Sequence, residues 1–166
     1  MKKVNIKVLT LEDFKIYGSF SNMINPDTPS LGNDSIRFYR DMEILDLGQA
    51  SDAAFSVTRV IKRPYIIDFV EYHMNSGEGV IPLDGDILMY VGLATPNGEI
   101  PVNKLEVFRV PKGTFVSIRQ GVWHGAPFAY GTEYVNILNV LPERAYAKDC
   151  LFHTIAEEEN IEIDVE

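Results

Sequence analysis

From Ser35 onward, the chain is a series of short runs rich in β-branched and aromatic residues, each bounded by turn-forming residues. Turn residues stand at Asp84-Gly85, Pro96-Asn97-Gly98 and Pro111-Lys112-Gly113. The strands predicted from this pattern are Ser35–Arg40, Ala54–Ile61, Tyr65–His73, Asp86–Leu93, Lys104–Val110, Thr114–Arg119 and Glu133–Leu141. Many short strands at this spacing favour a sandwich, a barrel or a double-sheet jelly roll, so the sequence predicts an all-β fold.

The beginning of the chain has a different pattern. Thr10 can cap a helix over Leu11–Tyr17, and Gly18 is placed to end it. The stretch Ser21–Asp34 is rich in Asn, Pro, Ser, Gly and Asp, which predicts a loop. The expected fold is therefore a β domain preceded by one short helix.

The formal net charge of −9 is concentrated at the C-terminal end. Six of the 24 acidic residues lie in 157–166, which leaves 18 acids against 15 bases elsewhere. We interpret residues 1–156 as a single domain and 157–166 as an acidic tail. Because Ile161, Ile163 and Val165 alternate with acids, the tail either adds a strand or hangs free.

Charge, hydropathy and cysteine content exclude several classes of protein. The near-neutral body has no basic face, which argues against binding to nucleic acid or to an anionic membrane surface. No apolar run is long enough to span a bilayer, and no secretory apolar region follows the start, so a cytoplasmic location is expected. Cys150 is the only cysteine, which excludes an intramolecular disulfide and a cysteine-built zinc site.

The predicted strand Tyr65–His73 carries the first sign of a site. Side chains alternate along a strand, so Glu71 and His73 share one face with Tyr65, Ile67 and Phe69. If that face is buried, the carboxylate needs a metal or another cation beside it. The alternative is an ordinary surface pair of a carboxylate and an imidazole.

Two spacing patterns along the chain also indicate a functional site. In the first, His73 is followed after four residues by Glu78, and six further residues separate Glu78 from Gly85. The second pattern consists of Gly113, Arg119, Gly121 and His124 at intervals of five, one and two residues. Both resemble the two motifs of the cupin superfamily, in that order along the chain.

The resemblance implies a cupin double-stranded β-helix, which is a jelly-roll barrel, with ligands converging inside it. The implied metal ligands are Glu71, His73, Glu78 and His124. Two imidazoles and two carboxylates suit a divalent ion such as Mn, Ni, Fe or Zn. The alternative is a metal-free barrel in which these side chains form a hydrogen-bond network.

A narrower resemblance is to the ureidoglycolate lyase family, also called ureidoglycolate hydrolases. It covers about residues 8–150 at modest identity. It is carried by Phe14-Lys-Ile-Tyr17-Gly18, Ser56-Val-Thr-Arg59, Glu71-Tyr-His73, Glu78-Gly-Val-Ile-Pro82-Leu-Asp-Gly85, and Gly121-Val-Trp123-His124 with Pro127-Phe128. The resemblance implies a cytoplasmic homodimeric enzyme of purine catabolism and allantoin degradation, which cleaves a small α-hydroxy acid ureide to glyoxylate and urea.

The chain departs from that family at two places. Gly125-Ala126 replaces the family's second His after Trp-His, and Glu78 stands where the family usually has Gln. Another metal-dependent cupin enzyme, such as an isomerase or a dioxygenase, therefore stays open as an alternative. A non-catalytic cupin that binds a small molecule is the other alternative.

Roles for individual residues follow from the resemblance and from their chemistry. The base that takes the substrate's hydroxyl proton is one of three residues: His124, Glu71 and Glu78. The carboxylate of the substrate pairs with Arg59 or Arg119, unless these are surface salt bridges. Tyr90 and Trp123 are candidates for the cavity wall, although Trp123 can instead pack behind the ligand strand.

Overall fold

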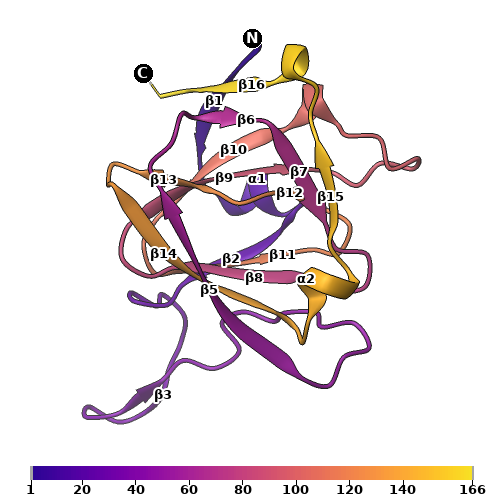
Figure 1. The fold of residues 1–166 in the computed structure, drawn as a ribbon. Coiled ribbons are helices and arrows are strands. Elements are labelled where there is room, and N and C mark those ends of the chain that lie inside the picture. Colours follow the sequence, from indigo (N-terminus) through magenta and orange to yellow (C-terminus); the bar gives the residue numbers. More distant parts are fainter. Residues whose placement is uncertain (1, 166) are drawn as a thin grey trace.

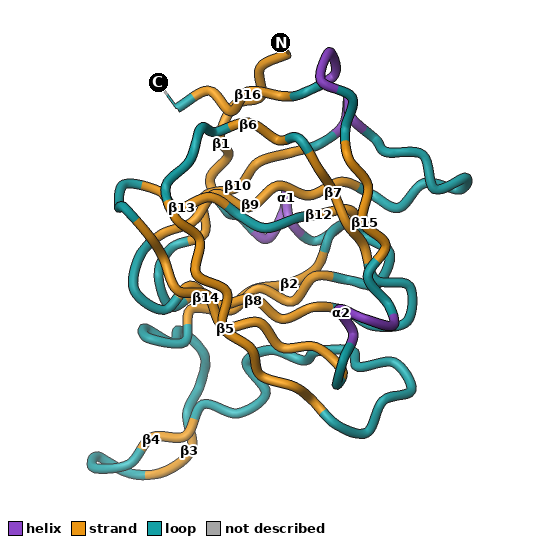
Figure 2. The backbone as a smooth tube through the Cα atoms, in the orientation of Figure 1, coloured by secondary structure: helices purple, strands orange, loops and turns teal. Residues whose placement is uncertain are grey.

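The computed structural model describes residues 2–165, and two β-sheets face one another in it across a shared core. In Figure 1 the larger sheet lies in the upper half of the molecule and the smaller sheet beneath it. Figure 2 shows that strands and their connecting loops make up nearly all of the chain. The prediction of a mainly β fold built from two sheets, with a short helix near the start, is confirmed.

The smaller sheet has the strand order β2–β11–β8–β14–β5, and its neighbouring strands run antiparallel. These strands are β2 (Gly18–Asn22), β5 (Ala53–Ile61), β8 (Glu78–Pro82), β11 (Thr114–Ile118) and β14 (Tyr134–Pro142). The pairing of β14 with β5 places Val135, Ile137 and Asn139 opposite Val60, Thr58 and Ser56. Because side chains alternate along a strand, these six residues share the inner face of the sheet.

The larger sheet has the order β15–β7–β12–β9–β10–β1–β16–β6, and β13 also pairs with β9. Its strands are β1 (Lys2–Val8), β6 (Ile66–Ile67), β7 (Phe69–Tyr72), β9 (Asp86–Gly92), β10 (Glu106–Val110), β12 (Trp123–His124), β13 (Phe128–Tyr130), β15 (Leu151–Thr154) and β16 (Ile161–Asp164). A separate small hairpin, β3 (Leu31–Gly32) with β4 (Arg37–Phe38), projects from the body in Figure 1.

The main core fills the space between the sheets. Fully buried apolar side chains come from both sheets, among them Met89, Phe108 and Ile137. Phe14 of α1 (Leu11–Phe14) adds its ring to this cluster and packs edge-on against Phe108, with ring centroids 5.3 Å apart. The short helix therefore contributes its one buried side chain to the core between the sheets.

The helices are shorter than expected. Thr10 caps α1 as predicted, since its hydroxyl accepts a hydrogen bond from the Asp13 N–H. The predicted extent to Tyr17 is wrong, because the helix ends at Phe14 and Gly18 already begins β2. The other helical turns are η1 (Val102–Lys104), α2 (Ala145–Lys148) and η2 (Glu157–Glu159). No helix within residues 2–165 is long and apolar enough to cross a bilayer.

The predicted strand Tyr65–His73 is interrupted at Asp68. Its first part, β6, pairs with β16, whereas its second part, β7, pairs with β12 and β15. The two parts therefore pair with different strands, and Asp68 lies between them. Ile67 and Val70 are nevertheless fully buried, and His73 lies just beyond the end of β7.

The acidic segment at the C-terminal end contributes a strand. β16 pairs in parallel with β1 and antiparallel with β6, which gives it a neighbour on both sides. Ile161 and Ile163 are buried, while the acidic residues between and after them are partly exposed. Of the two possibilities for this segment, the added strand is the one observed.

Candidate functional site

Three polar side chains meet between the two sheets. His73 follows β7, Glu78 begins β8, and His124 lies in β12. One ligand atom of each residue lies within 4.8 Å of the other two. Oε2 of Glu78 is 3.1 Å from Nε2 of His73 and 2.9 Å from Nε2 of His124. Two imidazole nitrogens and a carboxylate oxygen therefore converge, as in sites for first-row divalent metals.

The pairing of short strands brings the two histidines together. β12 lies between β7 and β9, with His124 opposite both Glu71 and Val91. The Gly121 N–H donates to the His73 carbonyl over 2.8 Å, which joins the turn before β12 to the end of β7. Gly121 has φ of 77°, a backbone conformation that favours glycine.

Backbone carbonyls fix the orientation of both imidazoles. Nδ1 of His73 donates to the carbonyl of Asp149 over 2.6 Å, and Nδ1 of His124 donates to the carbonyl of Val122 over 2.8 Å. Each ring then presents Nε2 toward Glu78. This arrangement is typical of metal-binding histidines, whose second nitrogen is held by an outer hydrogen bond. The donor set therefore fits a divalent metal ion.

Burial makes the charges of this cluster strongly interdependent, since the three residues are only 4 to 6% exposed. Burial alone would lower the pKa of His73, but hydrogen bonds to Glu78 and Asp149 and the charges of Glu78 and Glu71 outweigh it and raise that pKa. Burial would raise the pKa of Glu78, yet the hydrogen bonds and charges of both histidines hold it well below its usual range. In the metal-free cluster, the buried charge of Glu78 therefore favours the protonated form of His73.

Glu78 has no free oxygen in this arrangement. Its Oε2 lies within hydrogen-bond distance of Nε2 of both histidines, and its Oε1 accepts a hydrogen bond of 2.7 Å from Nδ2 of Asn139 on β14. A carboxylate with both oxygens engaged is a poor base but a well-oriented ligand. The geometry thus favours Glu78 as a metal ligand over its other predicted role, that of the catalytic base.

A cavity of about 220 Å³ opens beside the cluster. It lies between the sheets, and its wall includes polar side chains from β5 and β14 as well as the loop after β12. The lining residues are Ser56, Thr58, Glu71, His73, Glu78, Val80, Met89, Ile118, His124, Gly125, Ala126, Pro127, Asn139, Leu141, Tyr146 and Cys150. This volume suits a small molecule, and the ligand cluster forms part of its wall.

Glu71 lines this cavity but lies outside the three-residue cluster. Its Oε2 accepts a hydrogen bond of 3.0 Å from the Cys150 thiol. Burial, together with the hydrogen bond to Glu71 and nearby acidic charges, raises the pKa of Cys150 to about 12, so the group stays a neutral thiol donor. Glu71 is therefore a carboxylate at the cavity wall, beside the residues that could hold a metal.

The cavity lining contains two carboxylates and no lysine or arginine among the described residues. An anionic substrate would meet two carboxylates in such a space and no lysine or arginine with which to pair. A divalent cation bound by the cluster would make the electrostatic potential positive at the point where the substrate has to bind. The charge balance of the wall thus points to a metal-assisted site.

The predicted carboxylate-binding arginines do not line this cavity. Arg59 lies on the outer face of β5, where its Nε donates to Oδ1 of Asn136 and its guanidinium stacks 4.9 Å from the Tyr134 ring centroid. Arg119 follows β11 and is within 3.5 Å of the Ile16 carbonyl. Both are exposed, so the structure provides the surface contacts that the sequence left open as their alternative.

The two aromatic candidates are packing residues in this structure. Trp123 is 1% exposed and packs on Tyr72, with ring centroids 4.3 Å apart, on the side of β12 away from the cavity. Tyr90 is fully buried, and its hydroxyl donates to the Phe69 carbonyl. A Cβ added at Gly125 would lie 1.9 Å from the Tyr90 hydroxyl. Tyr90 thus occupies the space that any side chain at position 125 would need.

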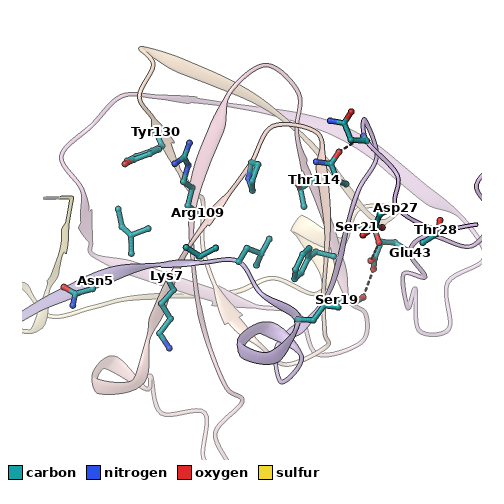
Figure 3. A pocket seen from close by; sticks show the side chains of 18 of the residues that line it. Asn5, Lys7, Ser19, Ser21, Asp27, Thr28, Glu43, Arg109, Thr114 and Tyr130 are labelled. Atoms are coloured by element: carbon teal, nitrogen blue, oxygen red, sulfur yellow. Dashed lines mark hydrogen bonds between the residues drawn. The ribbon is translucent and has the colours of Figure 1, made fainter.

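A larger groove of about 1050 Å³ runs along β1 and β2, away from the histidines. Figure 3 shows Arg109 beside Tyr130 on one side of it and Ser19, Ser21 and Glu43 on the other. These charged groups have partners of their own, since Arg109 pairs with Asp86 and Glu43 accepts from both serines. The groove lacks the convergent ligands of the smaller cavity, which is therefore the better candidate for chemistry.

Sequence reasoning missed three residues that support the site. Asn139 binds Glu78, Asp149 binds His73, and Cys150 binds Glu71. Neither Asn139 nor Asp149 belongs to a recognisable motif, and each lies far along the chain from its partner. Alternation on the strand Glu133–Leu141 could have placed Asn139 on the same face as Val135 and Ile137, which was the one available signal.

The raised pKa of His73 predicts how the stability of the metal-free protein depends on pH. A group whose pKa is raised on folding stabilises the folded state below its unfolded pKa, here 6.5, and this stabilisation is lost as pH rises through the folded pKa. We expect the melting temperature of chelator-treated protein to fall as the pH is raised above that value. Thermal melts of wild type and Glu78→Gln across this range measure it, because the variant lacks the carboxylate that raises the pKa. Equal pH profiles for both proteins would contradict the expectation.

Comparison with known proteins identifies the family of the chain. The ureidoglycolate lyase family model matches residues 1–162. The ureidoglycolate lyase of Rhodobacter capsulatus is 26% identical over 146 residues, which covers 86% of this chain and 89% of that protein. The enzyme of Pseudomonas aeruginosa is also 26% identical, over 99% of this chain and 97% of its own length.

Among solved structures, Bacillus subtilis oxalate decarboxylase is similar to part of the fold. The match has a TM-score of 0.43 at 17% identity and covers 62% of this chain, which spans 24% of that longer chain. The sequence matches, in contrast, extend over nearly the whole chain. The chain belongs to the ureidoglycolate lyase family.

Proposed function

We propose that this protein cleaves ureidoglycolate to glyoxylate and urea, with a divalent metal ion held by His73, Glu78 and His124. Family membership supports the reaction, because the relatives that match over nearly their whole length are ureidoglycolate lyases. The proposal of a bound metal is supported by the convergence of three ligand atoms within 4.8 Å at the wall of a small cavity. The absence of lysine and arginine from the described lining agrees with it.

A divalent ion in this position would bind the hydroxyl and carboxylate oxygens of an α-hydroxy acid and acidify the hydroxyl. The chain supplies the orientation of the ligands. The Asp149 and Val122 carbonyls hold the imidazoles, and Asn139 holds Glu78. These outer hydrogen bonds keep the ligand set in one geometry, which metal sites require for both affinity and reactivity.

Glu71 is placed to move the proton. It lines the same cavity, it is outside the ligand cluster, and its orientation is set by the Cys150 thiol. We assign to it the removal of the substrate's hydroxyl proton. The electron pair left on the oxygen then forms the carbonyl of glyoxylate, and the C–N bond breaks with its electron pair going to nitrogen. The same proton then returns to the departing nitrogen, which leaves as urea.

We also propose that the protein acts as a homodimer in the cytoplasm. One face of β5 supports an interface between copies, because Phe55, Val57 and Ile61 are 62 to 70% exposed on it. β5 is at the edge of the smaller sheet, and exposed apolar edge strands are typical of surfaces that pair with another chain.

The direct test is turnover of ureidoglycolate by protein loaded with Mn²⁺ or Ni²⁺. We expect glyoxylate and urea to appear in equal amounts, well above the rate of spontaneous decay in protein-free buffer. Chelator-treated protein is the control and should not exceed that background. If metal is bound but neither product forms, the lyase function is wrong, and oxygen uptake and sugar-epimer assays then distinguish the dioxygenase and isomerase alternatives.

A further inference from the structure

A single residue at the end of α2 makes an unusual number of contacts with the chain around His73. The Asp149 carbonyl accepts from Nδ1 of His73 over 2.6 Å. Its carboxylate accepts from the Met74 N–H over 2.8 Å, from the Asn75 N–H over 2.9 Å and from Nδ2 of Asn75 over 2.9 Å. One residue thus binds three consecutive residues that lie more than 70 positions earlier in the chain.

The two histidines of the cluster are held in different ways. Nδ1 of His124 donates to Val122, only two residues before it, so its orientation depends on the local backbone. His73 follows the end of β7, and its ring is oriented by Asp149 instead. The geometry of this ligand therefore depends on where the end of α2 lies.

The end of α2 is itself well anchored. The Asp149 N–H donates to the Ala145 carbonyl over 2.8 Å, and β15 begins at Leu151 opposite Tyr72 of β7. Between these two anchors, Cys150 binds Glu71. Residues 149–151 thus run alongside residues 71–75, so the position of Asp149 is defined on both sides.

We propose that Asp149 is the positioning residue for His73 and sets the affinity of the site for a divalent metal. Its carboxylate fixes the backbone after His73, and its carbonyl fixes the ring so that Nε2 faces Glu78. This inference rests on the metal site of the proposed function, but it does not depend on the lyase reaction.

The informative variant is Asp149→Asn. An amide nitrogen cannot accept from a backbone N–H, so one side of the carboxylate's contacts with Met74 and Asn75 becomes repulsive. The segment after His73 then shifts, and the ring loses its fixed orientation. Loss of an outer partner of a metal ligand reduces affinity by about 10- to 100-fold, and we expect a loss of that size here.

Asp84 offers a matched control, because it makes the same kind of contact far from the cluster. Its Oδ1 accepts from the Asn136 N–H over 2.8 Å, and its Oδ2 accepts from the side-chain amide of Asn136. It follows β8 at the end opposite to Glu78 and does not line the cavity. Asp84→Asn therefore makes the same chemical change without disturbing a residue of the metal-ligand cluster.

The experiment is calorimetric titration of Mn²⁺ into the chelator-treated wild type, Asp149→Asn and Asp84→Asn, with visible spectra of the Co²⁺ forms. Asp149→Asn is expected to bind Mn²⁺ about 10- to 100-fold more weakly and to have an altered Co²⁺ spectrum, whereas Asp84→Asn matches the wild type. Wild-type affinity in Asp149→Asn, or an equal loss in both variants, would overturn the proposal.

A second variant covers the possibility that Asp149→Asn does not fold. Asn75→Ala removes one side-chain contact to Asp149 and leaves the two backbone contacts in place. It should weaken Mn²⁺ binding in the same direction by a smaller factor, and unchanged binding in it would count against the proposal. A wild type that binds no Mn²⁺ at all would reject the metal centre itself, whereas bound metal without turnover would reject only the lyase function.

Discussion

Replacement of His124 by alanine is expected to abolish binding of a divalent metal and to leave the barrel folded. His124 supplies one of three ligand atoms, and the remaining pair of His73 and Glu78 cannot surround an ion. Because loss of an outer partner alone reduces metal affinity by about 10- to 100-fold, loss of a ligand should exceed about 100-fold. Elemental analysis of metal content, with circular dichroism to monitor the fold, measures both parts of this expectation. His73→Ala should behave in the same way.

His153→Ala is the matched control for these variants. His153 is exposed on β15, stacks on Tyr72 and does not line the cavity. The same substitution there should leave metal content at the wild-type level. Full metal content in His124→Ala would contradict the assignment of the ligands.

Glu71→Gln is expected to reduce turnover by about 10²- to 10⁴-fold while metal binding stays intact, because a positioned general base contributes a factor of that size. The amide keeps the shape of the side chain but cannot take the hydroxyl proton. Glu71 lies outside the three-residue cluster, so its loss should not release the ion. Steady-state kinetics together with metal content measure the two effects separately.

Glu133→Gln serves as the control for Glu71→Gln. Glu133 is exposed and pairs with Lys62, away from the cavity, so its variant should turn over at the wild-type rate. Loss of metal in Glu71→Gln would instead favour the four-ligand set that the cupin resemblance implied. Retention of wild-type turnover would contradict the role of Glu71 in proton transfer.

Much of the fold could be predicted because strand pattern and turn chemistry are local. The strands after Asp84-Gly85 and Pro111-Lys112-Gly113 were found at nearly their observed bounds, as β9 and β11. β1 was missed, since it is stabilised by parallel pairing with β10 and β16, which lie more than 100 residues further along the chain. The break at Asp68 was missed for the same reason, because it depends on which strands β6 and β7 meet.

The same distinction between local patterns and long-range contacts applies to the candidate site. The two cupin-like motifs identified His73, Glu78 and His124, although His124 lies 46 positions after Glu78. Arg59 and Arg119 were judged by charge alone, but β-strand alternation placed Arg59 on the outer face beside Asn136. Strand alternation could place Asn139 on the inner face, but the roles of Asn139 and Asp149 depend on contacts across 61 and 76 positions and belong to no motif.

The central claim is that one divalent ion, held by His73, Glu78 and His124, makes this chain a ureidoglycolate lyase. Stepwise addition of Mn²⁺ to chelator-treated protein, with glyoxylate and urea measured at each step, tests it most directly. The rate should rise in proportion to bound metal, reach a plateau at about one ion per chain, and stay at background in His124→Ala. Full turnover in the metal-free protein, or a metal-saturated protein that releases neither product, would contradict it.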